Sequence, residues 1–292
     1  DHWLSQTMEL LAGNPRWKLL YDTLPAIDFA FLGARSTLSI AGHLAPSRDA
    51  SERRFPFIAA IGFENQDPLG FLSNAPARLS TVWARLDSDV RKARSAPDAA
   101  PALQTLARGE LDVDGSRPGR SDIHDFLAGR HCGDLEALLS LPHRSVDLRR
   151  LMIALGLLLR PLSTTPGAVI ARGLDLPLPA DRAQRNNVAT LWMHLIGGFL
   201  RRTSLELQIL LGPFAGEMRM VVGFQGASAP SLAGTLDPDA ADPHNIRIDT
   251  ADWVDDQLGK DYGLAKLSSY LSQPRLPLDR AIETFREVFL GE

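Results

Sequence analysis

The first third of the chain alternates between helix-like and strand-like hydrophobic patterns. Residues 2–13 (HWLSQTMELLAG) carry apolar side chains at helical spacing and end in a glycine, which predicts an amphipathic helix. A second helix is predicted over 15–24, because Pro15 suits a first helical turn. Residues 27–44 alternate around the turn sequence GARS, which predicts a β-hairpin. The nearly unbroken apolar run 55–63 (FPFIAAIGF) is typical of a strand buried on both faces of a sheet.

The middle of the chain contains one polar helix and two linker-like stretches. Residues 83–93 (WARLDSDVRKA) are predicted to form a solvent-facing helix. Residues 95–101 and 112–122 are rich in Pro, Gly, Ser and Asp, which is typical of turns and linkers. We therefore expect an N-terminal α/β domain over 1–135 and a C-terminal mixed α/β domain over 136–292.

The second half again alternates between helices and strands. A helix is predicted from Ser145 or Asp147, either of which can cap it, to Pro161, which should close it. A short strand is expected over 167–174 (GAVIARGL). The remaining elements are a helix over 184–202, two strands over 205–212 and 217–224, a short helix over 229–236 and mostly helix from residue 250. Strands and helices that alternate in both halves indicate α/β layering.

Composition and charge narrow the classes of function. The 292 residues are 45% hydrophobic and carry a net charge of −4, which argues against a nucleic-acid-binding protein. The longest apolar run, 151–159, has about half the length that a bilayer requires, so a core helix is predicted there and no membrane insertion. Cys132 is the single cysteine and the first residues lack a signal-peptide pattern, which together favour the cytoplasm.

No short motif of known catalytic chemistry occurs in the sequence. The phosphate loop GxxxxGK[ST], the dinucleotide motif GxGxxG and the nucleophile elbow GxSxG are all missing. We therefore predict no catalytic residues and no cofactor, although residues from distant loops can still assemble a site.

Two clusters of potential metal ligands lack the spacing of known metal sites. The first lies in one short segment and comprises Asp122, His124, Asp125, His131, Cys132 and Asp134. Its spacings do not match those of zinc sites, so no metal is predicted. The second is the acidic segment from Asp237 to Asp261, in which DPDAAD lacks the central Gly and the closing Glu of a calcium loop. A solvated loop is predicted there, with contact to a basic partner as the alternative. Trp192 has helical spacing to apolar neighbours and is expected in the core.

The stretch 42–57 (GHLAPSRDASERRFPF) concentrates polar and charged side chains beside an apolar segment. Ser47, Asp49 and Arg53 lie close together there, so a ligand site, a catalytic loop and a structural latch are all open. Asp and Ser side chains before a turn commonly bond their own backbone. We therefore favour an internal clamp between Asp49 and Arg53 that sets the entry into the following strand.

The same stretch, with the residues before it, resembles the TagF family, also called ImpM, of the bacterial type VI secretion system. The pattern is carried by Tyr21, Pro25, Phe29, Gly42, Pro46, Ser47, Asp49, Arg53, Phe55 and Pro56. The chain departs from the pattern at Glu52, where family members often have Gly, and at Ile27–Asp28, where they often have an aromatic residue and Arg. The C-terminal half looks like the companion segment of longer family members.

The resemblance implies a fold, a cellular role and a partner. It implies a three-layer α/β/α sandwich for the N-terminal domain, in a non-catalytic cytoplasmic regulator. Such a regulator restrains secretion at the post-translational level, by binding a forkhead-associated scaffold protein. The candidate partner-binding residues are Gly42, Pro46, Ser47, Asp49, Arg53, Arg54, Phe55 and Pro56. The alternatives are a small-ligand-binding or hydrolytic enzyme that uses Ser47, Asp49 and Arg53, and a structural adaptor of the secretion apparatus.

Overall fold

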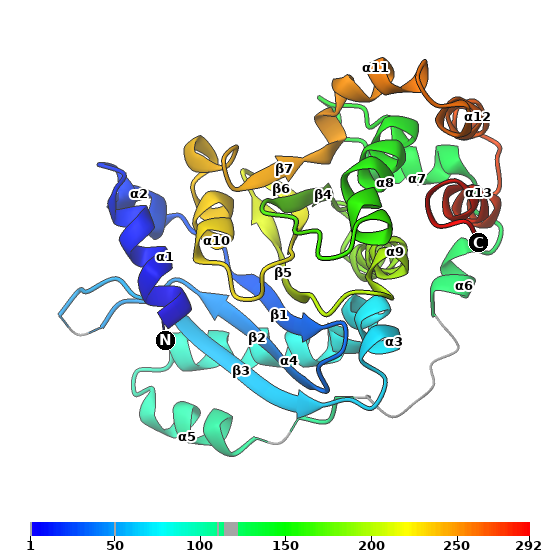
Figure 1. Cartoon of the computed structure of the whole chain (residues 1–292). Helices are drawn as coiled ribbons and strands as arrows, with labels where there is room; N and C mark the ends of the chain where they lie inside the picture. Colours follow the sequence, from blue (N-terminus) through cyan, green and yellow to red (C-terminus); the bar gives the residue numbers. More distant parts are fainter. Residues whose placement is uncertain (1, 50, 110, 114–121) are drawn as a thin grey trace.

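The computed structural model describes residues 2–49, 51–109, 111–113 and 122–292. Seven strands of this part of the chain form one mixed sheet (Figure 1). They are β1 (Ile27–Gly33), β2 (Leu38–Ala45), β3 (Phe57–Glu64), β4 (Gly173–Pro177), β5 (Glu206–Phe214), β6 (Glu217–Gly223) and β7 (Asn245–Arg247). Their order in the sheet is β3-β2-β1-β5-β6-β4-β7.

Helices of very different length surround the sheet. The α-helices are α1 (His2–Ala12), α2 (Trp17–Asp22), α3 (Pro68–Ser73), α4 (Ala75–Ser95), α5 (Ala100–Arg108), α6 (Asp122–Leu127), α7 (Cys132–Leu139), α8 (Leu148–Thr164), α9 (Arg182–Leu200), α10 (Ala229–Leu236), α11 (Asp255–Leu258), α12 (Tyr262–Leu271) and α13 (Leu278–Leu290). Short 3-10 helices follow α10 and β7, namely η1 (Pro238–Ala240), η2 (Ile248–Thr250) and η3 (Asp252–Val254).

The two faces of the sheet bury separate apolar clusters, because side chains alternate along each strand. On one face Phe29 and Leu210 pack with apolar residues of α1, α2 and α10. On the other face Ala30 and Ile209 pack with the core side of α3, α4, α8 and α9. Figure 1 shows α1 and α10 on one side of the strands and α4 on the other. The predicted α/β class, with helices on both faces of a sheet, is confirmed.

Strands from both halves of the chain share this sheet. The two halves are joined by the antiparallel pair β1–β5, in which Phe29 lies opposite Leu210. Three strands come from residues 27–64 and four from residues 173–247. The predicted division into 1–135 and 136–292 therefore separates strands of one continuous sheet, and it stays a prediction.

Two predictions about exposure are wrong. Strand β3 is the edge strand of the sheet, and it buries little more than Ala59, so it is not covered on both faces. Helix α4 does not face solvent along its length, because it packs on β2 and buries Leu79, Trp83 and Val90. Both errors have one cause, since apolar content alone does not say which neighbours cover an element.

Two element boundaries also differ from the prediction. Asp147 caps α8 by accepting a hydrogen bond from the backbone N–H of Arg150, as predicted, but Pro161 lies inside the helix, which continues to Thr164. The strand predicted over 167–174 begins only at Gly173, where β6 and β7 lie alongside β4. The start of β4 is therefore set by the position of the strands that pair with it, and not by the apolar content of the sequence.

The apolar run 151–159 forms the buried middle of α8. Trp192 is also in the core, as predicted, and its indole Nε1 donates to the carbonyl of Pro177 over 2.9 Å. Over the ranges that the structure describes, no helix combines the length and apolarity needed to cross a bilayer.

Candidate functional site

The segment between β2 and β3, residues 46–56, is called the motif loop below, and Asp49 organises it. One carboxylate oxygen of Asp49 accepts the backbone N–H groups of Ser51 and Arg53, each over 2.9 Å. The other accepts Nε of Arg53 over 2.6 Å. These hydrogen bonds hold the pKa of Asp49 below its usual value, and the predicted Asp49–Arg53 clamp is confirmed.

A second acid, Asp22 at the end of α2, ties the motif loop to the body of the protein. Arg54 donates Nε and Nη2 to its two oxygens, both over 2.8 Å, and Nη2 of Arg48 lies 2.7 Å from the same carboxylate. The two guanidinium groups hold the pKa of Asp22 far below its usual range. Asp22 is not among the residues predicted from the sequence. The signal for it is that the motif loop carries more arginines than acids, so an acid from elsewhere is needed.

Backbone contacts fix the start of the motif loop. The hydroxyl of Tyr21 donates to the carbonyl of Ser47 and accepts its N–H, both over 2.9 Å. Gly42 lies opposite Phe29 in the β1–β2 register, and a Cβ there would come within 2.6 Å of the Phe29 ring and 2.8 Å of the Ala59 carbonyl. Glycine is therefore required at position 42 by close packing.

A groove of about 900 Å³ lies beside the motif loop. Its walls are the loop, the end of α2, the end of α4 and helix α5, which contribute Tyr21, Arg48, Arg94 and Leu103 among others. Of the predicted site residues, Pro46 and Ser47 line this groove. Asp49 and Arg53 are outside its lining and bond each other, so the three polar residues of the motif do not converge on one pocket.

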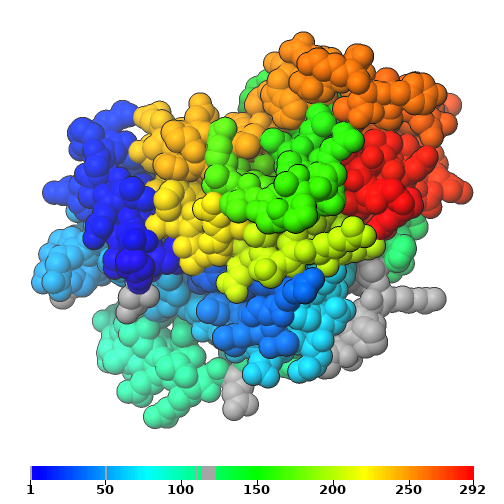
Figure 2. Space-filling model, viewed as in Figure 1, coloured from blue at the N-terminus to red at the C-terminus, as the bar shows by residue number. Residues whose placement is uncertain are grey.

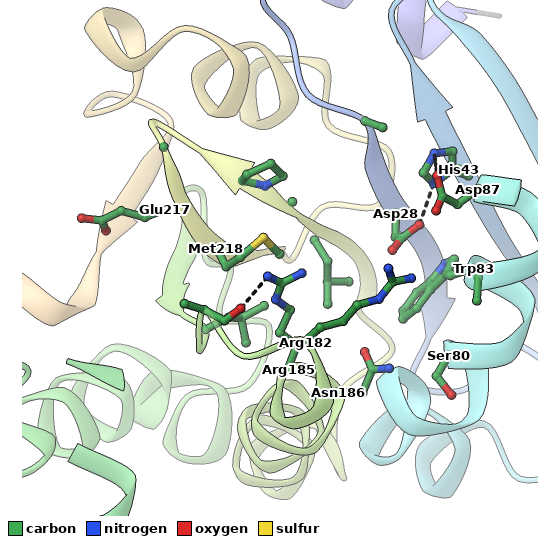
Figure 3. Close-up of a pocket in the computed structure, with 18 of the residues that line it drawn as sticks. Asp28, His43, Ser80, Trp83, Asp87, Arg182, Arg185, Asn186, Glu217 and Met218 are labelled. Carbon is green, nitrogen blue, oxygen red and sulfur yellow. Dashed lines mark hydrogen bonds and ion pairs between the residues drawn. The ribbon is translucent and has the colours of Figure 1, made fainter. Parts of the chain in front are cut away.

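A second hollow, called the central cavity below, has a volume of about 740 Å³ (Figure 3). Its walls come from β1, β2, α4, the start of α9 and the turn between β5 and β6. Figure 3 shows Asp28, His43 and Asp87 grouped on one side, with Arg182 and Arg185, from the first turn of α9, between them and Glu217. The central cavity therefore combines residues from both halves of the chain.

His43 is a buried polar residue in the wall of the central cavity. It lies within β2 and is 4% exposed. Its Nδ1 bonds Oδ1 of Asp28 over 2.7 Å. Its Nε2 lies 3.6 Å from Oδ1 of Asp87 and has no hydrogen-bond partner among the described residues. His43 and Ser47 thus line different hollows.

A network of buried charges supports the cavity wall formed by Glu217 and Arg144. At its centre Arg219, 1% exposed, donates to both oxygens of Asp249 over 2.9 and 3.1 Å and to Asp175 over 2.5 Å. Arg144 also pairs with Asp249 and Glu217.

The pKa values in this network follow from burial and from Arg219. Burial opposes ionisation of Asp249, but Arg219 together with Arg247 and Arg144 outweighs it and holds the pKa of Asp249 at about 2. Burial is the larger influence at Asp175 and raises its pKa despite the same arginine. The network therefore stabilises the fold, and the ionisation of each carboxylate in it depends on the neighbouring charges.

The two clusters weighed as metal sites have structural contacts instead. His131 and Asp134 cap the start of α7, and Cys132 is buried, which raises the pKa of its thiol to about 11. In the acidic stretch, Asp237 is buried and accepts from the side chain of Asn14 over 2.7 Å, so the prediction of a fully solvated loop is wrong. Asp239 is exposed and pairs with an arginine before α2.

The N-terminal part of the chain matches a known protein family. Residues 1–108 match the model of the TagF N-terminal domain, which is described as type VI secretion system-associated. The match covers the first 108 of the 292 residues. The resemblance inferred from the motif is confirmed, and this domain indicates a type VI secretion system-associated protein.

One solved structure aligns with most of the chain. It is the crystal structure of PA0076 from Pseudomonas aeruginosa PAO1, with 18% sequence identity, a TM-score of 0.40 and coverage of 82% of each chain. No curated protein matches this chain significantly.

The TagF N-terminal domain supplies the motif loop and all walls of the groove beside it, from α2 to α5. It supplies only part of the central cavity, namely the side that holds Asp28, His43 and Asp87. Arg182 and Arg185 come from the chain beyond the domain. The groove therefore lies within the matched region, whereas the central cavity also needs residues beyond it.

Proposed function

We propose that this protein is a non-catalytic cytoplasmic regulator of type VI secretion, which restrains secretion after translation by binding a forkhead-associated scaffold protein. The observation that carries the proposal is the TagF N-terminal domain over residues 1–108, with its motif loop held at the surface. The motif loop and the adjacent groove form the proposed binding surface.

The physical character of this surface supports binding of a protein. Elements that border the groove expose apolar side chains, with Leu19 64%, Phe55 46% and Leu103 41% exposed. Arg48 and Arg53 add guanidinium groups, and aromatic residues and Arg are enriched in interfaces. Figure 2 shows the loop, in light blue, standing out at the edge of the molecule above α5.

The order within the motif loop also favours binding. Asp49 and Asp22 already fix three arginines, so little conformational entropy remains to be lost when a partner docks. The same contacts argue against hydrolysis at Ser47, because Asp49 is occupied by Arg53 and His43 faces another hollow.

A calorimetric titration of the full chain with the scaffold protein of the same secretion system tests the proposal. We expect a dissociation constant in the micromolar range or tighter for the wild type. Leu103→Glu and Phe55→Glu place a charge in the surface and should weaken binding at least about tenfold, since burying an unpaired charge is costly.

The matched control is Tyr262→Glu, at an 86% exposed side chain on α12. It introduces the same charge far along the chain and should leave the affinity unchanged. The proposal is wrong if the wild type does not bind at micromolar concentrations, or if the control weakens binding as much as Leu103→Glu.

A further inference from the structure

The charges that line the central cavity are not all neutralised by one another. Arg91 pairs with Asp87, and Arg144 pairs with Glu217 and Asp249. Asp28 bonds His43. Arg182 and Arg185 are different, because neither pairs with a carboxylate in the part of the chain that the structure describes.

Arg182 and Arg185 are held together by their place in α9. With Asn186 they stand three and four residues apart at the start of the helix, so the three side chains share one face. Arg185 donates Nε and Nη2 to the carbonyls of Pro179 and Ala180 over 3.2 and 2.6 Å, which fixes its guanidinium. Burial, and then the neighbouring charge of Arg182, lower the pKa of Arg185. An anion would relieve this repulsion.

The group of Asp28, His43 and Asp87 in the same cavity gives a second, independent sign of a ligand. His43 lines the cavity, is almost fully buried and leaves Nε2 without a hydrogen-bond partner among the described residues. Buried polar atoms are nearly always satisfied, so an unsatisfied one at a cavity wall calls for a missing partner. Asp28 and Asp87 beside it can accept hydrogen bonds from a hydroxyl or ammonium group.

We propose that the central cavity binds a small organic phosphate that also carries a hydrogen-bond donor. Arg182, Arg185 and Asn186 take the phosphate, because a guanidinium matches two of its oxygens. The group formed by Asp28, His43 and Asp87 takes the hydroxyl or ammonium end. The volume of about 740 Å³ lies within the range of small-molecule sites. The ligand site does not depend on the proposed scaffold binding, which uses the motif loop.

Calorimetric titrations of the full chain test this site with three probes, namely inorganic phosphate, glycerol 3-phosphate and a short phosphoserine peptide. Saturable binding of a phosphomonoester is expected, with glycerol 3-phosphate tighter than inorganic phosphate because it also reaches the acidic group. A preference for glycerol 3-phosphate supports a site for a free small molecule, and a preference for the peptide overturns the assignment to a small molecule.

Variants separate a built site from general attraction to positive charge. Arg182→Ala should weaken phosphate binding about tenfold, the effect of losing one charge-assisted hydrogen bond. Arg202→Ala, at an exposed arginine just beyond the other end of α9, should leave it unchanged. Thermal unfolding of both variants checks that they fold. The proposal is overturned if no probe shows saturable binding at millimolar concentrations, or if the two variants weaken binding equally.

Discussion

Replacing Arg219 by Met tests whether the buried charge network braces the sheet. Met fills a similar volume but removes the guanidinium, which donates twice to the Asp249 carboxylate and once to the Asp175 carboxylate. The guanidinium also donates to Glu217 and to the backbone carbonyl of Asp175. Asp249 would keep Arg144 and Arg247, whereas Asp175 would lose its direct arginine partner in the described contacts. The variant therefore leaves a buried carboxylate without a paired charge.

The expected loss in the free energy of unfolding follows from this difference between Asp249 and Asp175. Breaking a buried ion pair costs about 3–5 kcal/mol, and the remaining partners of Asp249 place Arg219→Met near the lower end. The pKa of Asp249 falls from 3.8 to about 2, which corresponds to roughly 2 kcal/mol. Because this pKa is depressed, that contribution is present above about pH 4 and is lost as the pH falls towards 2.

Urea unfolding of the wild type and Arg219→Met at pH 7 and pH 4 measures both effects. We expect the free energy of unfolding of Arg219→Met to lie about 3 kcal/mol below that of the wild type at pH 7. This difference should narrow by about 1 kcal/mol at pH 4, because the unpaired Asp175 carboxylate takes up a proton. The control Arg280→Met removes an exposed pair with Glu283 and should cost less than about 1 kcal/mol. A difference below about 1 kcal/mol for Arg219→Met, or one independent of pH, would refute the reasoning.

Three further predictions concern single positions. Gly42→Ala should destabilise the protein by about 1–3 kcal/mol in urea unfolding, and less in a Phe29→Leu background; an equal loss in both backgrounds would rule out the clash between the two residues. Glu52 has a φ of 60°, so Glu52→Gly should raise the free energy of unfolding by up to about 1 kcal/mol while Glu52→Ala should not. A Glu52→Gly variant less stable than Glu52→Ala would contradict this. Cys132 is buried and its thiol has a pKa of about 11, so at pH 8 a thiol reagent should modify the folded protein about 100-fold more slowly than the urea-unfolded chain, and equal rates would contradict the burial.

Helices and strands whose apolar residues recur with a clear local periodicity were predictable from the sequence. The helix around Trp192 and the hairpin of residues 27–44 are both confirmed, because their patterns depend on side chains close in sequence. The Asp49–Arg53 clamp was predictable for the same reason, since the two residues stand four apart within one turn.

Features that depend on distant segments were not predictable. The edge position of β3 and the buried face of α4 follow from strand order, which apolar content does not encode. The contacts of Asp22 with the motif loop and of His43 with Asp87 join segments more than twenty residues apart. A single sequence gives each residue but not its partner, so the central cavity could not be foreseen.

Glu52 shows how the family pattern and the structure inform each other. Family members often have Gly at this position, and the backbone there adopts the left-handed conformation that glycine favours. Glu52 therefore departs from the family pattern in residue type but keeps the backbone conformation of the turn. Its side chain also forms an ion pair with Arg48 over 2.9 Å.

The binding titration with the forkhead-associated scaffold protein tests the central claim most directly. The account predicts micromolar or tighter binding by the wild type, a loss of at least about tenfold in Leu103→Glu and an unchanged affinity in Tyr262→Glu. A wild type that does not bind, or a Leu103→Glu variant that binds as well as Tyr262→Glu, would contradict the assignment of the motif-loop surface as the regulatory interface.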